Sequence, residues 1–117
     1  MNAVLQYEEY IKQITDALQQ IDPYKIILFG SAASGNLHED SDIDIIVVLS
    51  NETIPQTYDE KMKLKLSVRR ALREINKRVP IDTLTYTKKE YELILNNKNS
   101  FFREVDLTSR IIYEKAS

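Results

Sequence analysis

The chain begins with apolar residues that recur at intervals of three and four positions. This spacing places them on one side of a helix. We therefore predict an amphipathic helix over residues 2–20, ended by the pair Asp22-Pro23. The apolar positions on its predicted buried side are Val4, Tyr7, Ile11, Ile14, Leu18 and Ile21.

Two short runs that follow are almost purely apolar and rich in β-branched residues. The first, Lys25–Phe29, lies between a proline and a glycine, and the second, Ile43–Leu49, reads IDIIVVL. Short apolar runs bounded by turn residues are typical of buried strands. Residues 30–41 are predicted to connect them, with a short helical turn beginning near Ser31.

The second half of the chain alternates between helical and strand patterns. Residues 58–78 place apolar side chains on one helical face, and Pro80 stops the predicted helix. Residues 81–87 (IDTLTYT) alternate between apolar and polar, which predicts a strand with one buried face. The remaining predicted elements are a polar loop at 51–57, short helices at 90–95 and 101–107, and an edge strand at 111–113.

The predicted order of elements is α-β-β-α-β-α-α-β. This order predicts an α/β (α+β) fold in which helices flank a mixed central sheet. A chain of 117 residues is long enough for one hydrophobic core. We therefore expect a single domain over residues 1–117, without a separate substrate domain.

Composition excludes several classes of protein. No apolar run is long enough to span a membrane, and the first residues do not resemble a signal peptide. The absence of cysteine excludes disulfides and thiolate zinc sites. The net charge of −2 argues against a free-standing binder of bulk nucleic acid, so no direct nucleic-acid binding is expected. We expect a cytoplasmic protein.

The chemistry of the chain is concentrated between the first two predicted strands. Gly30-Ser31 follows the first strand directly, and after ten more residues Asp42-x-Asp44 begins the second. Side chains two positions apart in a strand share a face, so these two carboxylates should lie close together. Such a pair suits Mg²⁺, and two such ions can assist an in-line phosphoryl displacement. Gly30 would let the backbone approach a phosphate, and Ser31 at a helical turn would favour an anion.

Asp82 is the candidate for a third carboxylate. It is the second residue of the third predicted strand, directly after Pro80-Ile81. If that strand neighbours the second one, Asp82 converges with the other carboxylates and could accept the proton of an attacking hydroxyl. The structural alternatives are that Asp42 and Asp44 cap loop N–H groups, that Asp82 is a strand-edge charge, and that Ser31 caps a helical turn.

This pattern resembles the polymerase-β-type nucleotidyltransferase superfamily. The stretch LFGSAASGNLHEDSDIDIIV, the small size and the final IIYE resemble its minimal nucleotidyltransferase branch, over residues 25–113. The resemblance implies transfer of a nucleoside monophosphate from an NTP, with ATP expected, to an acceptor hydroxyl with loss of pyrophosphate. It implies that Asp42 and Asp44 bind two Mg²⁺ ions, that Asp82 binds one ion and the nucleophile, and that Gly30 and Ser31 bind the triphosphate.

The chain departs from that branch at one position. Many minimal members carry an arginine just before the second glycine of the loop, and Ser34 stands there in this chain. Lys25, or a basic residue of the predicted helix at 58–78, could supply the missing cation. Half of the 16 Lys and Arg residues lie in that helix: Lys61, Lys63, Lys65, Arg69, Arg70, Arg73, Lys77 and Arg78. A solvated outer face is favoured there over a surface that faces phosphates or a partner.

The resemblance also implies a partner. Minimal members often pair with a small helical toxin of the HEPN type, and in some pairs the nucleotidyltransferase is the antitoxin and adds AMP to a tyrosine of the toxin. The small predicted domain agrees with an acceptor that arrives on another protein. Two alternatives stay open: an antitoxin that masks its toxin without catalysis, and an aminoglycoside-type subunit that modifies a small molecule. A homodimer and a hetero-oligomer are both compatible with the sequence.

Overall fold

The computed structural model describes residues 3–30, 42–97 and 109–116. Ser31, Ser34 and the predicted helix at 101–107 lie outside the described residues. The described elements run in the predicted order, and no helix among them has the length and apolar character that a membrane crossing requires.

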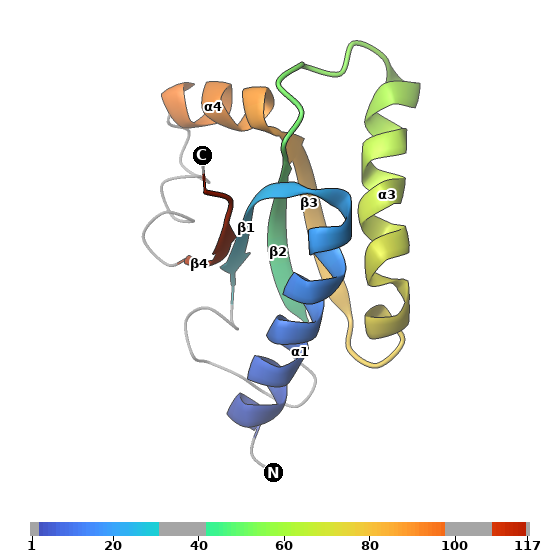
Figure 1. The fold of residues 1–117 in the computed structure, drawn as a ribbon, viewed down its shortest axis with the longest axis vertical. Helices are drawn as coiled ribbons and strands as arrows, with labels where there is room; N and C mark the ends of the chain where they lie inside the picture. Colours follow the sequence, from blue (N-terminus) through green and yellow to red (C-terminus); the bar gives the residue numbers. More distant parts are fainter. Residues whose placement is uncertain (1–2, 31–41, 98–108, 117) are drawn as a thin grey trace.

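A mixed four-stranded sheet forms the centre of the described fold. Its strands are β1 (Pro23–Phe29), β2 (Ile43–Leu49), β3 (Ile81–Thr87) and β4 (Arg110–Glu114), in the spatial order β3-β2-β1-β4. β2 and β3 are parallel, whereas β1 pairs antiparallel with both β2 and β4 (Figure 1). The predicted mixed sheet flanked by helices is therefore confirmed.

Helices cover the two faces of the sheet unequally. α1 (Ala3–Leu18) and α3 (Tyr58–Asn76) pack on one face, where they form the larger core with β1 and β2. α4 (Lys88–Asn97) packs on the other face through the buried Tyr91. The side chains of the larger core that are fully buried are Ile14, Leu18, Ile26, Leu28, Ile43, Ile45, Val47 and Val68.

Alternation along β2 assigns its residues to the two faces. Ile43, Ile45 and Val47 belong to the core under α1 and α3, and Ile46 and Val48 belong to the core under α4. Because successive side chains of a strand point to opposite faces, Asp44 shares the α4 side of the sheet.

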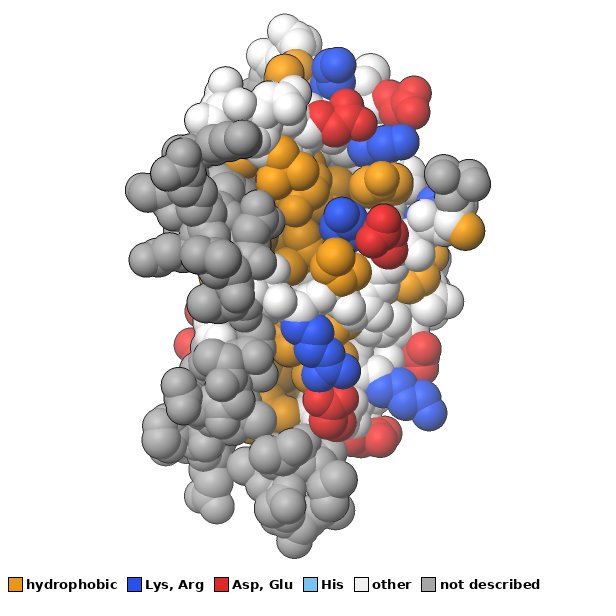
Figure 2. Space-filling view, turned by 90° about the vertical axis from the view of Figure 1, so that its left-hand side faces the viewer, with side chains coloured by type: hydrophobic (Ala, Val, Ile, Leu, Met, Phe, Trp, Pro, Cys, Tyr) orange, Lys and Arg blue, Asp and Glu red, His pale blue; other side chains and the backbone are white. Residues whose placement is uncertain are grey.

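The side of the molecule that carries α4 and β4 keeps some apolar surface. Figure 2 shows this side, where hydrophobic side chains are visible between charged ones. Leu93 of α4 and Ile111 of β4 are both exposed. Neither of these two side chains belongs to a buried core.

Local interactions explain where the elements begin and end. Asp22 ends the first helical segment in a left-handed conformation, with φ 54°, after a 3-10 turn at Gln19–Ile21. Pro23 then begins β1, a position that proline tolerates because it opens the strand. Thr57 caps α3, since its hydroxyl accepts a hydrogen bond from the Glu60 N–H.

Several predicted boundaries were wrong by a few residues. The long helix ends at Asn76 and not at residue 78, because the N–H groups of Arg78 and Val79 turn back to the Ile75 carbonyl. α4 begins directly after β3 and is longer than the predicted helix at 90–95, because the Thr87 hydroxyl accepts a hydrogen bond from the Glu90 N–H and starts it earlier. β1 and β4 also extend beyond the predicted limits.

Candidate functional site

The candidate site lies where β2 and β3 begin and β1 ends. The Ile43 N–H donates a hydrogen bond of 2.9 Å to the Pro80 carbonyl and so aligns the starts of the two strands. In this parallel register Asp44 is the direct partner of Asp82, and on its other side Asp44 is the partner of Phe29. The predicted convergence of Asp44 and Asp82 from neighbouring strands is what the structure shows.

The carboxylates lie away from the helix that covers their face. α4 follows the end of β3, so it packs near the opposite end of the sheet (Figure 1). Asp42 precedes β2 and is exposed, Asp82 is exposed, and Asp44 is partly buried between them. An incoming molecule can therefore reach this carboxylate group.

Gly30 is required next to Asp44 for two independent reasons. Its φ of +74° lies in the left-handed region, which side chains disfavour. A Cβ atom built at this position would collide with the Asp44 Oδ2 and would lie 3.3 Å from the Asp44 Cγ. Sequence reasoning expected this glycine to make room for a phosphate; in the structure it also makes room for the Asp44 carboxylate.

Burial and neighbouring negative charge raise the pKa of Asp44. Partial burial removes water from its carboxylate, and this is the largest cause. The negative charges of Asp82 and Asp42 act in the same direction, and a hydrogen bond between the Asp44 and Asp82 carboxyl groups adds to the shift of this pKa. In the absence of a cation, the ionised form of Asp44 is therefore unfavourable.

These residues suit a hard cation in chemistry, although they do not form a closed cage. Among the described residues, no group of three or more His, Cys, Asp or Glu side chains is already arranged to hold a metal ion. The carboxyl groups of Asp44 and Asp82 are in hydrogen-bonding contact, and Asp42 is close enough to affect the Asp44 pKa. Mg²⁺ commonly takes one or two carboxylates and completes its shell with water and substrate phosphates. Asp42, Asp44 and Asp82 are the residues that would hold it.

The raised pKa of Asp44 predicts that this site costs stability in the metal-free protein. A carboxyl group whose pKa is higher in the folded than in the unfolded state opposes folding once pH exceeds the unfolded-state value, and the effect is complete above the folded-state value. Asp44→Asn removes this charge. We expect its Tm to rise by on the order of a few degrees at neutral pH without metal.

The measurement is thermal unfolding with and without Mg²⁺ at neutral and at acidic pH. The increase in Tm should be absent at a pH below the unfolded-state pKa, where Asp44 is protonated in both the folded and the unfolded protein. Asp16→Asn, at an exposed position of α1, is the matched control and should leave Tm unchanged. A lower Tm for Asp44→Asn at neutral pH would contradict the proposed repulsion.

Lys25 does not replace the positive charge of the arginine that relatives carry at the position of Ser34. It lies near the start of β1, about 16 Å from Gly30 at the strand's rise per residue. Its ammonium group is 5.7 Å from the centre of the Tyr91 ring and 4.0 Å from Glu114. Lys25 was therefore a wrong candidate for the missing cation. A basic residue of the long helix is the other candidate.

Basic side chains of α3 lie near the start of β3, on the sheet face opposite to the one that carries the Asp82 carboxylate. A groove between α3 and β3 is lined by Arg69, Arg70, Arg73, Lys77 and Asp82. The sequence favoured a solvated outer face for the basic residues of this helix, and Arg69, Arg70, Arg73 and Lys77 are exposed as that interpretation expects. Their spacing immediately before the strand that carries Asp82 also places them along one groove.

Comparisons with known proteins were made for the whole chain. The family model described as "Polymerase beta, Nucleotidyltransferase" matches residues 10–117. A search of curated proteins found no match.

Solved structures share the fold at low sequence identity. A protein from Sulfolobus solfataricus described as a nucleotidyltransferase superposes with a TM-score of 0.63 at 15% identity, covering 98% of this chain and 90% of that one. A toxin–antitoxin structure with AMP-PNP superposes with a TM-score of 0.53 at 18% identity, and the match covers 90% of this chain and 73% of that one. A mutant of the toxin–antitoxin pair MntA–HepT superposes with a TM-score of 0.51 at 16% identity, again over 90% of this chain and 73% of that one. In that mutant two aspartates two positions apart are changed to glutamate.

Proposed function

Because the chain belongs to the polymerase beta nucleotidyltransferase family, we propose that it transfers AMP from ATP to a hydroxyl group of a partner protein, as the antitoxin of a toxin–antitoxin pair. The observation that carries the proposal is the meeting of Gly30, Asp44 and Asp82 at one end of the sheet. A protein that only masked its partner would not need a partly buried carboxylate whose pKa is raised by two others.

We propose a role for each residue. Asp42 and Asp44 would hold Mg²⁺, which supplies neutralisation of the phosphate charge when bound. Asp82, on the outer side of Asp44, is placed to take the proton of the attacking hydroxyl. The new bond forms between the acceptor oxygen and the α-phosphorus, and the bond from that phosphorus to pyrophosphate breaks.

Gly30 would position the nucleotide on the inner side of the carboxylates. Its backbone carries no side chain that could hinder an approaching triphosphate, and β1 ends beside Asp44. Ser31 follows directly in the sequence and is proposed to donate its hydroxyl to the same phosphates. The nucleotide would thus approach from the β1 side and the acceptor from the β3 side.

The choice of ATP and of a toxin partner rests on the structural neighbours. One of the toxin–antitoxin structures contains AMP-PNP, an analogue of ATP, and the other carries changes at two aspartates with the same spacing as Asp42 and Asp44. We propose by this likeness that the partner of the present chain is a toxin of the HEPN type. A hetero-oligomer with that toxin would then bring the acceptor hydroxyl to Asp82.

The test follows the α-phosphate of ATP. The protein is incubated with Mg²⁺, a lysate of the source cell that contains the partner, and ATP labelled at the α-phosphate. We expect label on one protein band and none after EDTA is added. Mass spectrometry of that band then identifies the modified hydroxyl.

Other outcomes distinguish the alternatives. Label only in small molecules would favour a metabolite- or drug-modifying subunit. No label with any of the four NTPs, although the partner is demonstrably present, would favour an antitoxin that acts by masking.

A further inference from the structure

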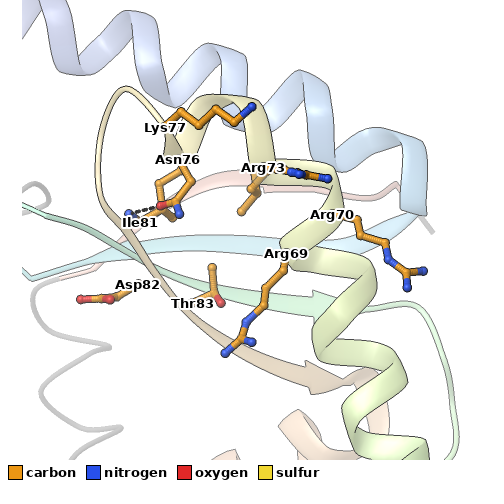
Figure 3. A pocket seen from close by; sticks show the side chains of 9 residues that line it. Arg69, Arg70, Arg73, Asn76, Lys77, Ile81, Asp82 and Thr83 are labelled. Carbon is orange, nitrogen blue, oxygen red and sulfur yellow. Dashed lines mark hydrogen bonds between the residues drawn. The ribbon is translucent and has the colours of Figure 1, made fainter.

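The groove between α3 and β3 is a distinct feature next to the candidate site. Its volume is about 540 Å³, which lies in the range of ligand pockets. Three arginines of α3 and Lys77, directly after that helix, line one side of it, and Thr83 of β3 lies on the other side, while the Asp82 carboxylate points away from the basic side chains (Figure 3). Leu72 and Ile81 add apolar surface to its wall.

The three arginines of this groove lack acidic partners among the described residues. Some other basic groups of the described chain are matched to acids, such as Lys61 to Glu90 and Arg110 to Glu8, whereas Lys63 and Lys65 of α3 have no described ion pair either. Arg69, Arg70 and Arg73 are exposed and take part in no described ion pair. Three like charges on one side of a groove repel each other, and an anion between them would remove that repulsion.

The groove lies on the acceptor side of the carboxylates. Across the sheet, Gly30 follows β1, Asp44 belongs to β2 and Asp82 belongs to the edge strand β3. The groove is lined by α3 and by the first three residues of β3, Ile81–Thr83, so it meets the carboxylate group at the edge of the sheet. The Asp82 carboxylate itself is on the other face, and a segment that lies in the groove would reach it by passing around the edge of β3.

Side chains occupy part of the free edge of β3. The Ile81 N–H donates to Asn76, the Thr85 carbonyl accepts from Lys61, and the Thr87 N–H donates to Glu90. These peptide groups are not available to an added strand.

We propose that this groove binds an acidic segment of the acceptor protein, in which Asp or Glu residues flank the hydroxyl that receives the nucleotide. Guanidinium groups bind carboxylates in a two-pronged geometry, and Arg69, Arg70 and Arg73 present three of them along a groove that reaches the edge of β3 at Asp82. The inference rests on the proposed function, since it gives the chemistry of that function's acceptor.

A polynucleotide acceptor fits the groove less well. None of the residues that line the groove is aromatic, so no described side chain there can stack on a base. The net charge of the whole chain is −2, which does not favour a long polyanion. A short acidic peptide needs only the local positive charge of the groove.

The test measures binding without catalysis. Fluorescence anisotropy compares a labelled peptide in which glutamates flank one tyrosine, the same peptide with glutamines, and a single-stranded RNA of similar length. Wild type is compared with Arg69→Gln/Arg70→Gln/Arg73→Gln. The control is Lys12→Gln/Lys63→Gln/Lys65→Gln, which removes equal charge at exposed positions outside the groove.

We expect the glutamate peptide to bind wild type and the lysine control equally, and to bind the arginine variant about tenfold or more weakly. Added salt should weaken the wild-type complex and reduce that difference. Preferential binding of the RNA, equal binding by wild type and the arginine variant, or no binding of the glutamate peptide would each overturn the proposal.

Failure of this inference is distinguishable from failure of the proposed function. Nucleotide transfer to the lysate band by the arginine variant at the wild-type rate would overturn the groove assignment and leave the function standing. If wild type transfers no nucleotide but its peptide binding still depends on the arginines, the proposed function is overturned. The groove would then remain a binding surface for acidic segments.

Discussion

The double variant Asp42→Asn/Asp44→Asn is expected to lose nucleotide transfer by roughly 10³-fold or more while it stays folded. Asparagine keeps the shape of aspartate but removes both negative charges that would hold Mg²⁺. Without that cation the triphosphate meets the remaining carboxylate of Asp82, and repulsion replaces attraction. The measurement is the initial rate of label transfer from ATP at saturating Mg²⁺.

A matched control separates lost chemistry from lost structure. Asp16→Asn/Glu92→Gln changes two exposed carboxylates on α1 and α4 and should transfer at the wild-type rate. Circular dichroism should show the same helix content for all three proteins. The Asp42→Asn/Asp44→Asn protein should unfold at the same or a higher temperature in metal-free buffer, because burial and like charge raise the Asp44 pKa in wild type. Full transfer by this variant would contradict the assignment of the two aspartates.

Sequence patterns were sufficient for most of the framework of this site. The apolar run Ile43–Leu49 and the alternating run at 81–87 match β2 and β3 residue for residue, because both are short, bounded by turns and half or fully buried. These predicted strand ranges placed Asp44 and Asp82 each at the second position of its strand. Their contact needed one further fact, the parallel pairing of the two strands, which the helix between them makes possible.

Interactions between residues distant in the sequence were not predictable in the same way. Lys61 belongs by spacing to the same basic stripe as Arg69 and Arg73, yet it is held by Glu90 at 2.9 Å and by the Thr85 carbonyl at 2.7 Å. Lys25 was a plausible phosphate ligand in the sequence but packs beside Tyr91. Periodicity assigns a residue to a helix face, whereas its partner depends on which element the fold places opposite that face.

The groove arginines are a second case in which the sequence pattern was not sufficient. Charged side chains on a helix are solvated in most proteins, and a pattern alone cannot distinguish that case from a binding surface. The proposal of a binding surface rests on two structural facts: Arg69, Arg70 and Arg73 have no acidic partner among the described residues, and they line a groove that reaches Asp82. Both facts depend on the closeness of α3 to the edge of β3.

Gly30→Ala is expected to cost stability and to lose transfer by roughly 10²-fold. An alanine in the left-handed region costs about 1–2 kcal/mol, and its Cβ would also push against the Asp44 carboxylate. The carboxylate can relieve the contact only by leaving its present position. A displaced Asp44 no longer holds Mg²⁺ correctly, so the rate should fall even at temperatures where the variant is fully folded.

A double-mutant cycle separates the two causes of that loss. Asp44→Ala removes the carboxylate that the new Cβ would meet, so in this background Gly30→Ala should cost only the backbone part, about 1–2 kcal/mol. In the presence of Asp44 the same change should cost more, measured by urea unfolding of all four proteins. Equal costs in both backgrounds would show that the backbone conformation alone requires glycine. A larger cost beside Asp44 would show that Gly30 is also needed to keep this carboxylate in position for catalysis.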